Sequence, residues 1–504
     1  MATPHSARRS PSFSIAVVAA LAVGLAGACT SSRAPRTVAE PEPTGSPAAV
    51  PSHTAAASVA IDCGSASQPA PNPIAVSTTI PVDASFPGGS TSTIAGLQCD
   101  FDVFSWNSFI AVNHAPDGRF GGDDGDNPTT WESWPESSNI FLPGGAEPLE
   151  WKAGEPPPAG PIPEVCRGQA GGGALPVFRQ LGKTPDVLEA TDQPFLSGPL
   201  IDTHGWYSRF IITVNQEMYA YIRDHALYGR SGQKTFADGG NTVAFPCGCA
   251  GAPCAPGGQQ GAIMVKAAWK VIDVAHGDDP SRFHTTDALV LTPAREGVPA
   301  TCERRTMGLV GLHIGHKTQG SPQWLWSTFE QVDNVPTQGA AASAQRYNYF
   351  LPGCEGCNAV NVPPPQPWQP HDEPIADDAR KSQIERAIPI TVFNETMNAQ
   401  VQEELLAGTV WRYYQLVSTQ WPTHASDDST TSPAAANGWC AGLNVTDNTG
   451  APAPQFLANT TLETYIQGTV PLASSSCINC HLNATMAEGV RNFSDFTYLL
   501  ERAQ

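Results

Sequence analysis

The sequence is poor in positive charge. Its 504 residues include 27 Lys and Arg against 47 Asp and Glu, which gives a net charge of −20 at pH 7. A protein surface that binds nucleic acid needs a basic footprint, so this class of protein is excluded. The acidity suits two other roles, which are solubility and docking with a partner of basic surface by charge complementarity.

The sequence also lacks the short motifs that would indicate several classes of enzyme. It contains no H-E-x-x-H, no G-x-S-x-G and no nucleotide-binding fingerprint. No motif therefore indicates a zinc peptidase, a serine hydrolase or a nucleotide-dependent enzyme. Beyond the N-terminus, no apolar stretch is long enough to span a membrane.

The one long apolar stretch lies at the N-terminus and has the form of an export signal. Arg8 and Arg9 precede an apolar segment over residues 13–26, which is short for a membrane span of about 20 residues. It ends in LAGAC, which resembles the lipobox of bacterial lipoproteins and makes Cys29 the lipidated residue. We therefore expect a lipoprotein signal peptide at residues 1–28 and an exported, periplasmic or extracytoplasmic protein held to a membrane by lipid. An ordinary secretory signal is the alternative.

Residues 29–95 are expected to form a flexible tether. The segment from Thr30 to Pro87 is rich in Ala, Ser, Thr and Pro and almost free of aromatic residues, so it cannot bury enough apolar surface to offset the entropy of ordering. Cys63 is the one residue there that could fasten the segment to the body. Residues 96–504 show no internal repeat and no second linker, and we expect them to form a single large domain.

The body of the chain predicts an α+β fold. Short segments of alternating polarity, separated by turn-rich stretches, favour a mainly antiparallel β-sheet with peripheral helices and long loops. Strands are expected at residues 206–214, 262–272, 283–291, 306–317, 323–331 and 410–420. Helices are expected from about residue 100, and at 216–223, 395–407, 459–467 and 494–502.

The motif with the clearest chemistry is C-x-x-C-H at Cys477, Cys480 and His481. This spacing is typical of covalent c-type haem attachment, in which two thiolates bind the haem vinyl groups and the adjacent His becomes the proximal axial ligand of the iron. A disulfide would not need the His. A zinc site would need two further ligands, which Cys354 and Cys357 could supply. In an exported chain, cysteines are oxidised more often than metallated, which counts against the zinc site. The motif therefore favours one covalent haem c at the C-terminal end of the domain.

The other cysteines are expected to form disulfides. The sequence has 13 Cys; setting aside Cys29 for lipid and two for haem leaves ten, which allows up to five disulfides. Cys354 and Cys357 are followed by Asn358 rather than His, so they are not a second haem site. They are expected to form structural disulfides, either with each other or with other cysteines, because the sequence does not give the connectivity.

The distal side of the iron must be built by chain that precedes Cys477. Met486 lies only five residues after His481 and is expected on the same side of the haem plane. We therefore expect the haem to sit at the edge of the large domain, not in a separate cytochrome module.

The strand expected at Met307–Lys317 offers the best distal candidates. In a regular strand, one face would carry Met307, Leu309, His313 and Lys317. The other face, with His316, would be apolar core. His313 or Met307 is therefore the expected distal ligand. The alternatives are that these residues are structural and that the iron has an open distal side.

Several distinctive blocks lie between Cys99 and Gln504. They read SWNSFIAVN at 105–113, WESW at 131–134, GLVGLHIGHKT at 308–318, WLWSTFE with VDNVP at 324–336, and SCINCH with DFTYLL at 476–481 and 495–500. Together they resemble a family of exported bacterial proteins labelled "cytochrome c family protein". The resemblance implies haem attachment at the C-x-x-C-H motif. It also implies that the blocks around His313 and Trp324 belong to the same unit as the haem, and it implies no particular reaction.

Three functions follow from these patterns. The first is electron transfer by a membrane-anchored mono-haem cytochrome with a redox partner protein. The second is a haem-dependent oxidoreductase, peroxidase-like or acting on a small organic substrate, because the domain is much larger than electron transfer requires. The third is a haem-free binding lipoprotein stabilised by disulfides.

Overall fold

The computed structural model describes residues 58–63, 72–84, 94–115, 120, 128–158, 160–169, 175–181, 198–249, 258–295, 297–340, 345–423, 451–468, 475–487, 489–490 and 492–504. All of them belong to one compact unit, His53–Gln504. The predicted signal peptide at 1–28 and the predicted lipidation site Cys29 lie outside the described residues.

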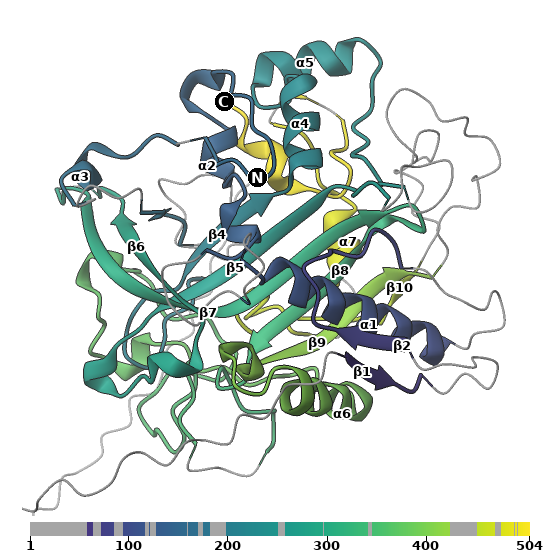
Figure 1. Cartoon of the computed structure of the whole chain (residues 1–504). Helices are drawn as coiled ribbons and strands as arrows, with labels where there is room; N and C mark the ends of the chain where they lie inside the picture. The colour runs from purple at the N-terminus through teal and green to yellow at the C-terminus, as the bar shows by residue number, and fades with distance from the viewer. Residues whose placement is uncertain are drawn as a thin grey trace, which may run out of the picture. The chain divides into compact units, whose positions relative to one another are not determined.

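A mixed eight-stranded sheet runs through the middle of this unit (Figure 1). Its main path is β10–β9–β8–β7–β5–β4. Off this path, β6 pairs with β7 and with β3. The strands are β3 (Val177–Phe178), β4 (Arg209–Val214), β5 (Ile263–Val271), β6 (Thr285–Thr292), β7 (Thr301–Thr318), β8 (Ser321–Gln331), β9 (Tyr414–Pro422) and β10 (Pro452–Ala453). Among the described strands, every pairing is antiparallel except that of β3 with β6.

Strand β7 pairs with three other strands of the sheet. Its first part pairs with β6 and its second part with β8, while β5 runs along its middle. Opposite the neighbouring residues Ala268 and Trp269 of β5, strand β7 places Gly311 and Leu309. Val310 is therefore an extra residue, a β-bulge, and the side-chain alternation of β7 is interrupted there.

Helices surround the sheet, and three of the described ones, α2, α3 and α7, have only four or five residues. The helices are α1 (Ile94–Val112), α2 (Ser137–Ile140), α3 (Glu164–Arg167), α4 (Gln216–Asp224), α5 (Arg230–Asp238), α6 (Val392–Gln400) and α7 (Cys477–His481). Helix α6 continues into a π-helical turn at Val401–Leu405, and a 3₁₀ helix spans Tyr498–Arg502. With a sheet and helices as separate elements, the predicted α+β class is confirmed.

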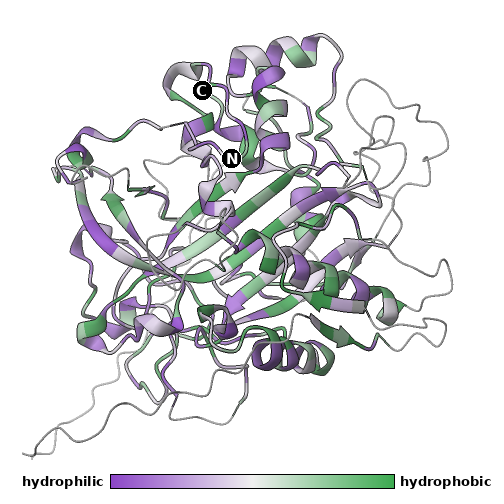
Figure 2. Cartoon of the chain, in the orientation of Figure 1, coloured by the Kyte–Doolittle hydropathy of each residue, from purple (hydrophilic) through white to green (hydrophobic). Residues whose placement is uncertain are grey.

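The longest of these helices, α1, covers one face of the sheet. Ser105 on α1 lies 2.6 Å from the Ser327 hydroxyl of β8 and 2.5 Å from the Thr419 hydroxyl of β9. Around these polar contacts the aromatic side chains of α1 pack on the strands, for example Trp106 against Phe329 at 5.1 Å between ring centroids. Figure 2 shows hydrophobic residues along the central strands, whereas α5, with Gln233 as its only buried residue, is largely hydrophilic.

Part of the predicted tether belongs to the folded body. Strands β1 (Ser58–Ile61) and β2 (Asn72–Ala75) form an antiparallel pair, and Val59, Ile61 and Ile74 are buried. A disulfide joins Cys63 to Cys99 of α1. The predicted boundary at residue 95 is therefore too late, because three apolar side chains and one disulfide suffice to dock a segment that is otherwise poor in apolar residues.

The predicted strands match the observed ones closely, but the helices match less well. Helix α1 begins at Ile94 rather than near residue 100, and α5 was not predicted. Residues 459–467 form successive turns instead of a helix, because the Asn459 side chain accepts a hydrogen bond from Thr461 N–H and donates one to the Phe329 carbonyl of β8. Only Tyr498–Arg502 is helical within the predicted helix 494–502.

These turns press closely on β7, and this contact yields a stability prediction. A Cβ added at Gly311 would overlap Thr461 Oγ1 and would lie 3.1 Å from Asn459 Oδ1, whereas one at Gly356 would meet nothing within 4 Å. We expect Gly311→Ala to lower the free energy of unfolding by about 1–3 kcal/mol, because overpacking forces the Thr461 and Asn459 side chains out of their positions. Gly356→Ala serves as the control and should leave it nearly unchanged. Urea denaturation measures both, and equal stability of the two variants would contradict the close packing.

Candidate haem attachment site

The C-x-x-C-H motif forms the whole of helix α7, which packs on β8 and β9. Gln420 of β9 holds the start of this helix: its Oε1 accepts hydrogen bonds from Ile478 N–H at 2.8 Å and from the Ser476 hydroxyl at 3.2 Å. The Ile478 side chain is fully buried. Cys477 and Cys480 are half-buried thiols, and their spacing of three residues places both on one side of the helical turn.

The His481 imidazole is oriented by the segment that follows it. Its Nδ1 lies 2.7 Å from the Phe496 carbonyl oxygen. A carbonyl only accepts hydrogen bonds, so Nδ1 carries a proton, and in the neutral imidazole the lone pair is then on Nε2. The ring also contacts Trp326 of β8 at 4.4 Å and Tyr498 at 5.4 Å between centroids. Proximal metal-binding histidines are oriented in this way, with the second nitrogen hydrogen-bonded to a carbonyl or carboxylate.

The Phe496 carbonyl belongs to an unusual turn. Asp495 and Phe496 both have positive φ angles, 50° and 62°. Residues other than Gly adopt this conformation at a cost in free energy. The buried Asp495 carboxylate accepts hydrogen bonds from Phe245 N–H at 2.7 Å and from Trp324 Nε1–H at 3.4 Å. It also forms an ion pair with Lys317 of β7, and both side chains are completely inaccessible to solvent. Burial lowers the pKa of Lys317, and the charge of Asp495 opposes this shift.

His313 and Met307 lie on opposite faces of the sheet, so the expectation that they share a face is wrong. Directly opposed residues of neighbouring strands point to the same side. His313 pairs with Lys266 and Met307 pairs with Val271, and these two positions of β5 differ by an odd number of residues. The β-bulge at Val310 is the cause. Met307 is fully buried on its own face.

The face of His313 is the one that His481 contacts. Trp326, which touches the His481 ring, pairs with Gly315, two residues along β7 from His313. The Nε2 atom of His313 lies 3.2 Å from Glu463 Oε2, but among the described residues it has no hydrogen-bond partner. Of the two predicted distal residues, only His313 is therefore on the side of the sheet where the motif lies.

His316 faces α1, in agreement with the prediction that its side of β7 is core. Its ring packs against Phe104 at 5.5 Å between centroids, and it is 1% exposed. Among the described residues, neither ring nitrogen has a hydrogen-bond partner. Burial lowers the pKa of His316 from 6.5 to about 3, so the side chain is neutral in the folded protein.

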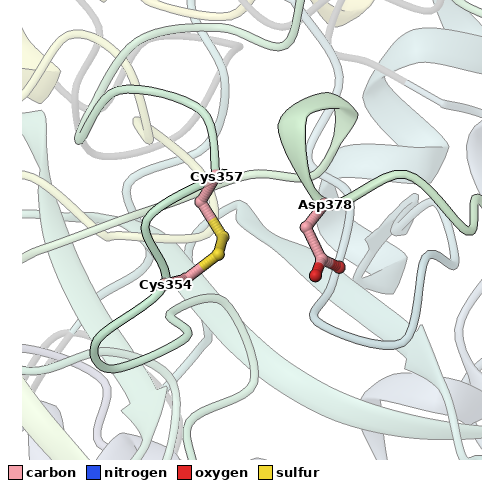
Figure 3. A group of neighbouring side chains, drawn as sticks. All are labelled: Cys354, Cys357 and Asp378. Atoms are coloured by element: carbon pink, nitrogen blue, oxygen red, sulfur yellow. A yellow bond between two sulfur atoms is a disulfide. The ribbon is translucent and has the colours of Figure 1, made fainter. Parts of the chain in front are cut away.

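Cys354 and Cys357 are joined to each other by a disulfide. This is one of the two pairings that the sequence left open. Figure 3 shows the Asp378 carboxylate beside this bond, and the three groups could place donor atoms within 4.8 Å of one another. Sulfur atoms in a disulfide do not serve as thiolate ligands, and Asp378 forms an ion pair with Lys381 at 2.7 Å. The pair therefore does not supply the zinc ligands that the alternative interpretation of the motif required. A further disulfide joins Cys166 to Cys302.

The structure brings together four segments that are distant in the sequence: the motif, β7 through Lys317, β8 through Trp324 and Trp326, and the turn at Asp495 and Phe496. All four lie in blocks that carried the family resemblance, but the roles of Lys317, Asp495 and Phe496 were not predicted. A Lys at the end of an apolar strand was the one available signal. The donor set fits a covalent haem, since two thiols share one helical turn and the adjacent imidazole has its Nδ1 proton engaged.

Comparisons with known proteins add no relative. The chain matches no family model, no curated protein and no solved structure. No helix among the described residues is long and apolar enough to cross a membrane. The description of the site therefore depends on its residues alone.

Burial of His316 predicts a sensitivity to acid. Because the unfolded chain takes up a proton near pH 6.5 and the folded chain only near pH 3, stability should fall as the pH drops below 6.5, by up to about 1.4 kcal/mol per pH unit. His316→Leu should remove this contribution, so the variant should gain stability over the natural protein between pH 6 and about 4, but not at pH 8. Denaturation midpoints across this range measure the difference, and identical pH profiles would contradict it.

Proposed function

We propose that this protein is an exported, lipid-anchored c-type cytochrome that carries one covalent haem and transfers electrons. Cys477 and Cys480 would form the two thioether bonds, and His481 would be the proximal axial ligand. The observation that carries the proposal is the hydrogen bond from His481 Nδ1–H to the Phe496 carbonyl. It holds the imidazole in the tautomer that an iron ligand requires, with the lone pair on Nε2.

The surroundings of α7 support a rigid attachment point. Gln420 fixes the first turn of the helix, and the Tyr498 hydroxyl donates a hydrogen bond to the Cys480 carbonyl at 2.9 Å. The tail after the motif is bound to the body, because Gln233 donates to the Leu500 carbonyl and Arg230 to the Ala503 carbonyl. A haem held here would lie against the large domain, as the sequence predicts, and not in a separate module.

Electron transfer is favoured over a catalytic role. Haem iron accepts and donates one electron at a time, and a protein that fills both axial positions reserves the iron for this exchange. His313 is proposed as the second axial ligand, because it lies on the sheet face that the motif contacts. The net charge of −20 suits a partner with a basic surface. The rings of Trp326 and Tyr498 pack against the His481 imidazole and would help to keep its orientation constant during the exchange.

The first test is attachment itself. In bacteria with a working c-type attachment system, the natural chain should retain one haem after denaturation, whereas Cys480→Ser and His481→Ala should lose the covalent chromophore. Pyridine haemochrome spectra and haem staining of denaturing gels measure this.

The chain contains its own control for this test. The double variant Cys354→Ser/Cys357→Ser removes a second C-x-x-C pair, which is joined by a disulfide and is not followed by His. It should keep the haem. A colourless natural protein, or loss of haem from this control alone, would refute the assignment.

The second test concerns the distal ligand. We expect His313→Ala to convert a low-spin spectrum to a high-spin one and to open the iron to carbon monoxide. Met307→Leu, a substitution of similar volume on the opposite face, should leave the spectrum unchanged. Absorbance and electron paramagnetic resonance spectra distinguish these outcomes. If the His313 variant stays low-spin, the second ligand comes from another residue.

A further inference from the structure

We propose that the buried ion pair of Lys317 and Asp495 is a positioning device for His481: it holds the turn whose Phe496 carbonyl orients the imidazole. The inference rests on the proposed function only for its effect on the iron, because the orientation itself is a property of the protein chain. Lys317 contacts Asp495, and Asp495 precedes Phe496, whose carbonyl lies against His481. Both residues would therefore act through Phe496.

The turn cannot hold its shape unaided. Asp495 and Phe496 are consecutive residues with positive φ, and each costs about 1–2 kcal/mol relative to the ordinary backbone conformations. Three donors from three other segments converge on the Asp495 carboxylate: Phe245 N–H, Trp324 Nε1–H and the Lys317 ammonium group. These contacts determine where Asp495 lies and thereby fix the direction of the next carbonyl along the chain.

The partner on β8 is also in an unusual conformation. Trp324 has a φ of 69° inside a strand, and its side chain is fully buried. Three of the five non-glycine residues with positive φ among the described residues are thus Trp324, Asp495 and Phe496, and Trp324 and Asp495 are joined by a hydrogen bond. Strain of this kind persists only where the surrounding contacts over-determine the backbone.

Stability alone does not account for the pair. Lys317 and Asp495 are both 0% exposed, and desolvating two charges offsets most of their mutual attraction, so apolar residues of similar volume would stabilise the fold as well or better. An ion pair does what an apolar pair cannot, because it fixes the direction of an attached group. Here that group is the turn that carries the acceptor of His481.

The consequence for His481 is chemical as well as geometric. A carbonyl that accepts the Nδ1 proton selects the tautomer with the lone pair on Nε2 and increases the basicity of that atom. Through the Lys317–Asp495 pair, strand β7 would therefore influence the basicity of His481 Nε2, the atom that would bind the iron. If the pair is lost, the turn should relax and this hydrogen bond should weaken.

The test uses the full chain with both charges removed, as Lys317→Met/Asp495→Asn. Removing both avoids an unpaired buried charge, and the introduced amide keeps an oxygen that can accept from Phe245 and Trp324. The first readout needs no haem: ¹⁵N-histidine NMR of protein made without attachment reports the His481 tautomer, assigned by comparison with His481→Ala. We expect a single Nδ1–H tautomer in the natural chain and a mixture of both tautomers in the variant.

The second readout is the reduction potential of the haem-loaded protein. A less basic axial imidazole stabilises the oxidised iron less, so the potential of the variant should shift upward. Arg386→Met/Glu330→Gln is the matched control, because it removes another buried ion pair, at 2.6 Å, that is bonded to Thr460 instead of the tail. This control should change neither readout.

The outcomes separate this inference from the proposed function. An unchanged tautomer and an unchanged potential in Lys317→Met/Asp495→Asn would overturn the positioning role while haem attachment stands. If no haem attaches to the natural chain, the proposed function fails, and the NMR readout still decides the role of the pair. Equal changes in the control variant would show general loosening of the fold and would also overturn the positioning role.

Discussion

The hydrogen bond between His481 Nδ1–H and the Phe496 carbonyl is the constraint on which the site depends. It joins the helix that carries the motif to the turn that follows it in the tail. Each of these two segments is fastened separately to the sheet, the helix through Gln420 of β9 and the turn through Lys317 of β7. The geometry of the imidazole is therefore set by neighbouring strands and not by the short helix alone.

The two faces of the sheet differ in what covers them. One face is covered by α1 and holds His316 in an apolar setting; the other carries His313 and Trp326 and receives α7. A single extra residue in β7, Val310, changes which side chains belong to which face. It separates Met307 from His313, although both lie on one continuous strand. A β-bulge near a candidate site thus determines which residues are available to it.

Much of the sheet could be predicted from the sequence, because β-branched and aromatic runs such as 263–271 and 321–331 report strands directly. A disulfide role for Cys354 and Cys357 was also predictable, since oxidising conditions and the missing His leave few other roles, but their pairing with each other was not. The bulge was not, because a regular strand and a bulged one share the same hydrophobic pattern. The buried pair of Lys317 and Asp495 escaped prediction for a related reason, since single-sequence patterns assign charged residues to the surface. The turns at 459–467 look helical in composition, but Asn459 bonds to the sheet instead.

The separation of the paired residues along the chain has a consequence for the order of folding. Lys317 and Asp495 are 178 positions apart, and α7 is only five residues long, too short to form a stable helix by itself. Until the strands have assembled, the two thiols lie in an unstructured stretch that any modifying enzyme can reach; afterwards they are half-enclosed. Assembly of the sheet therefore reduces access to the two sulfurs, and an enzyme that modifies them would reach them most easily before it.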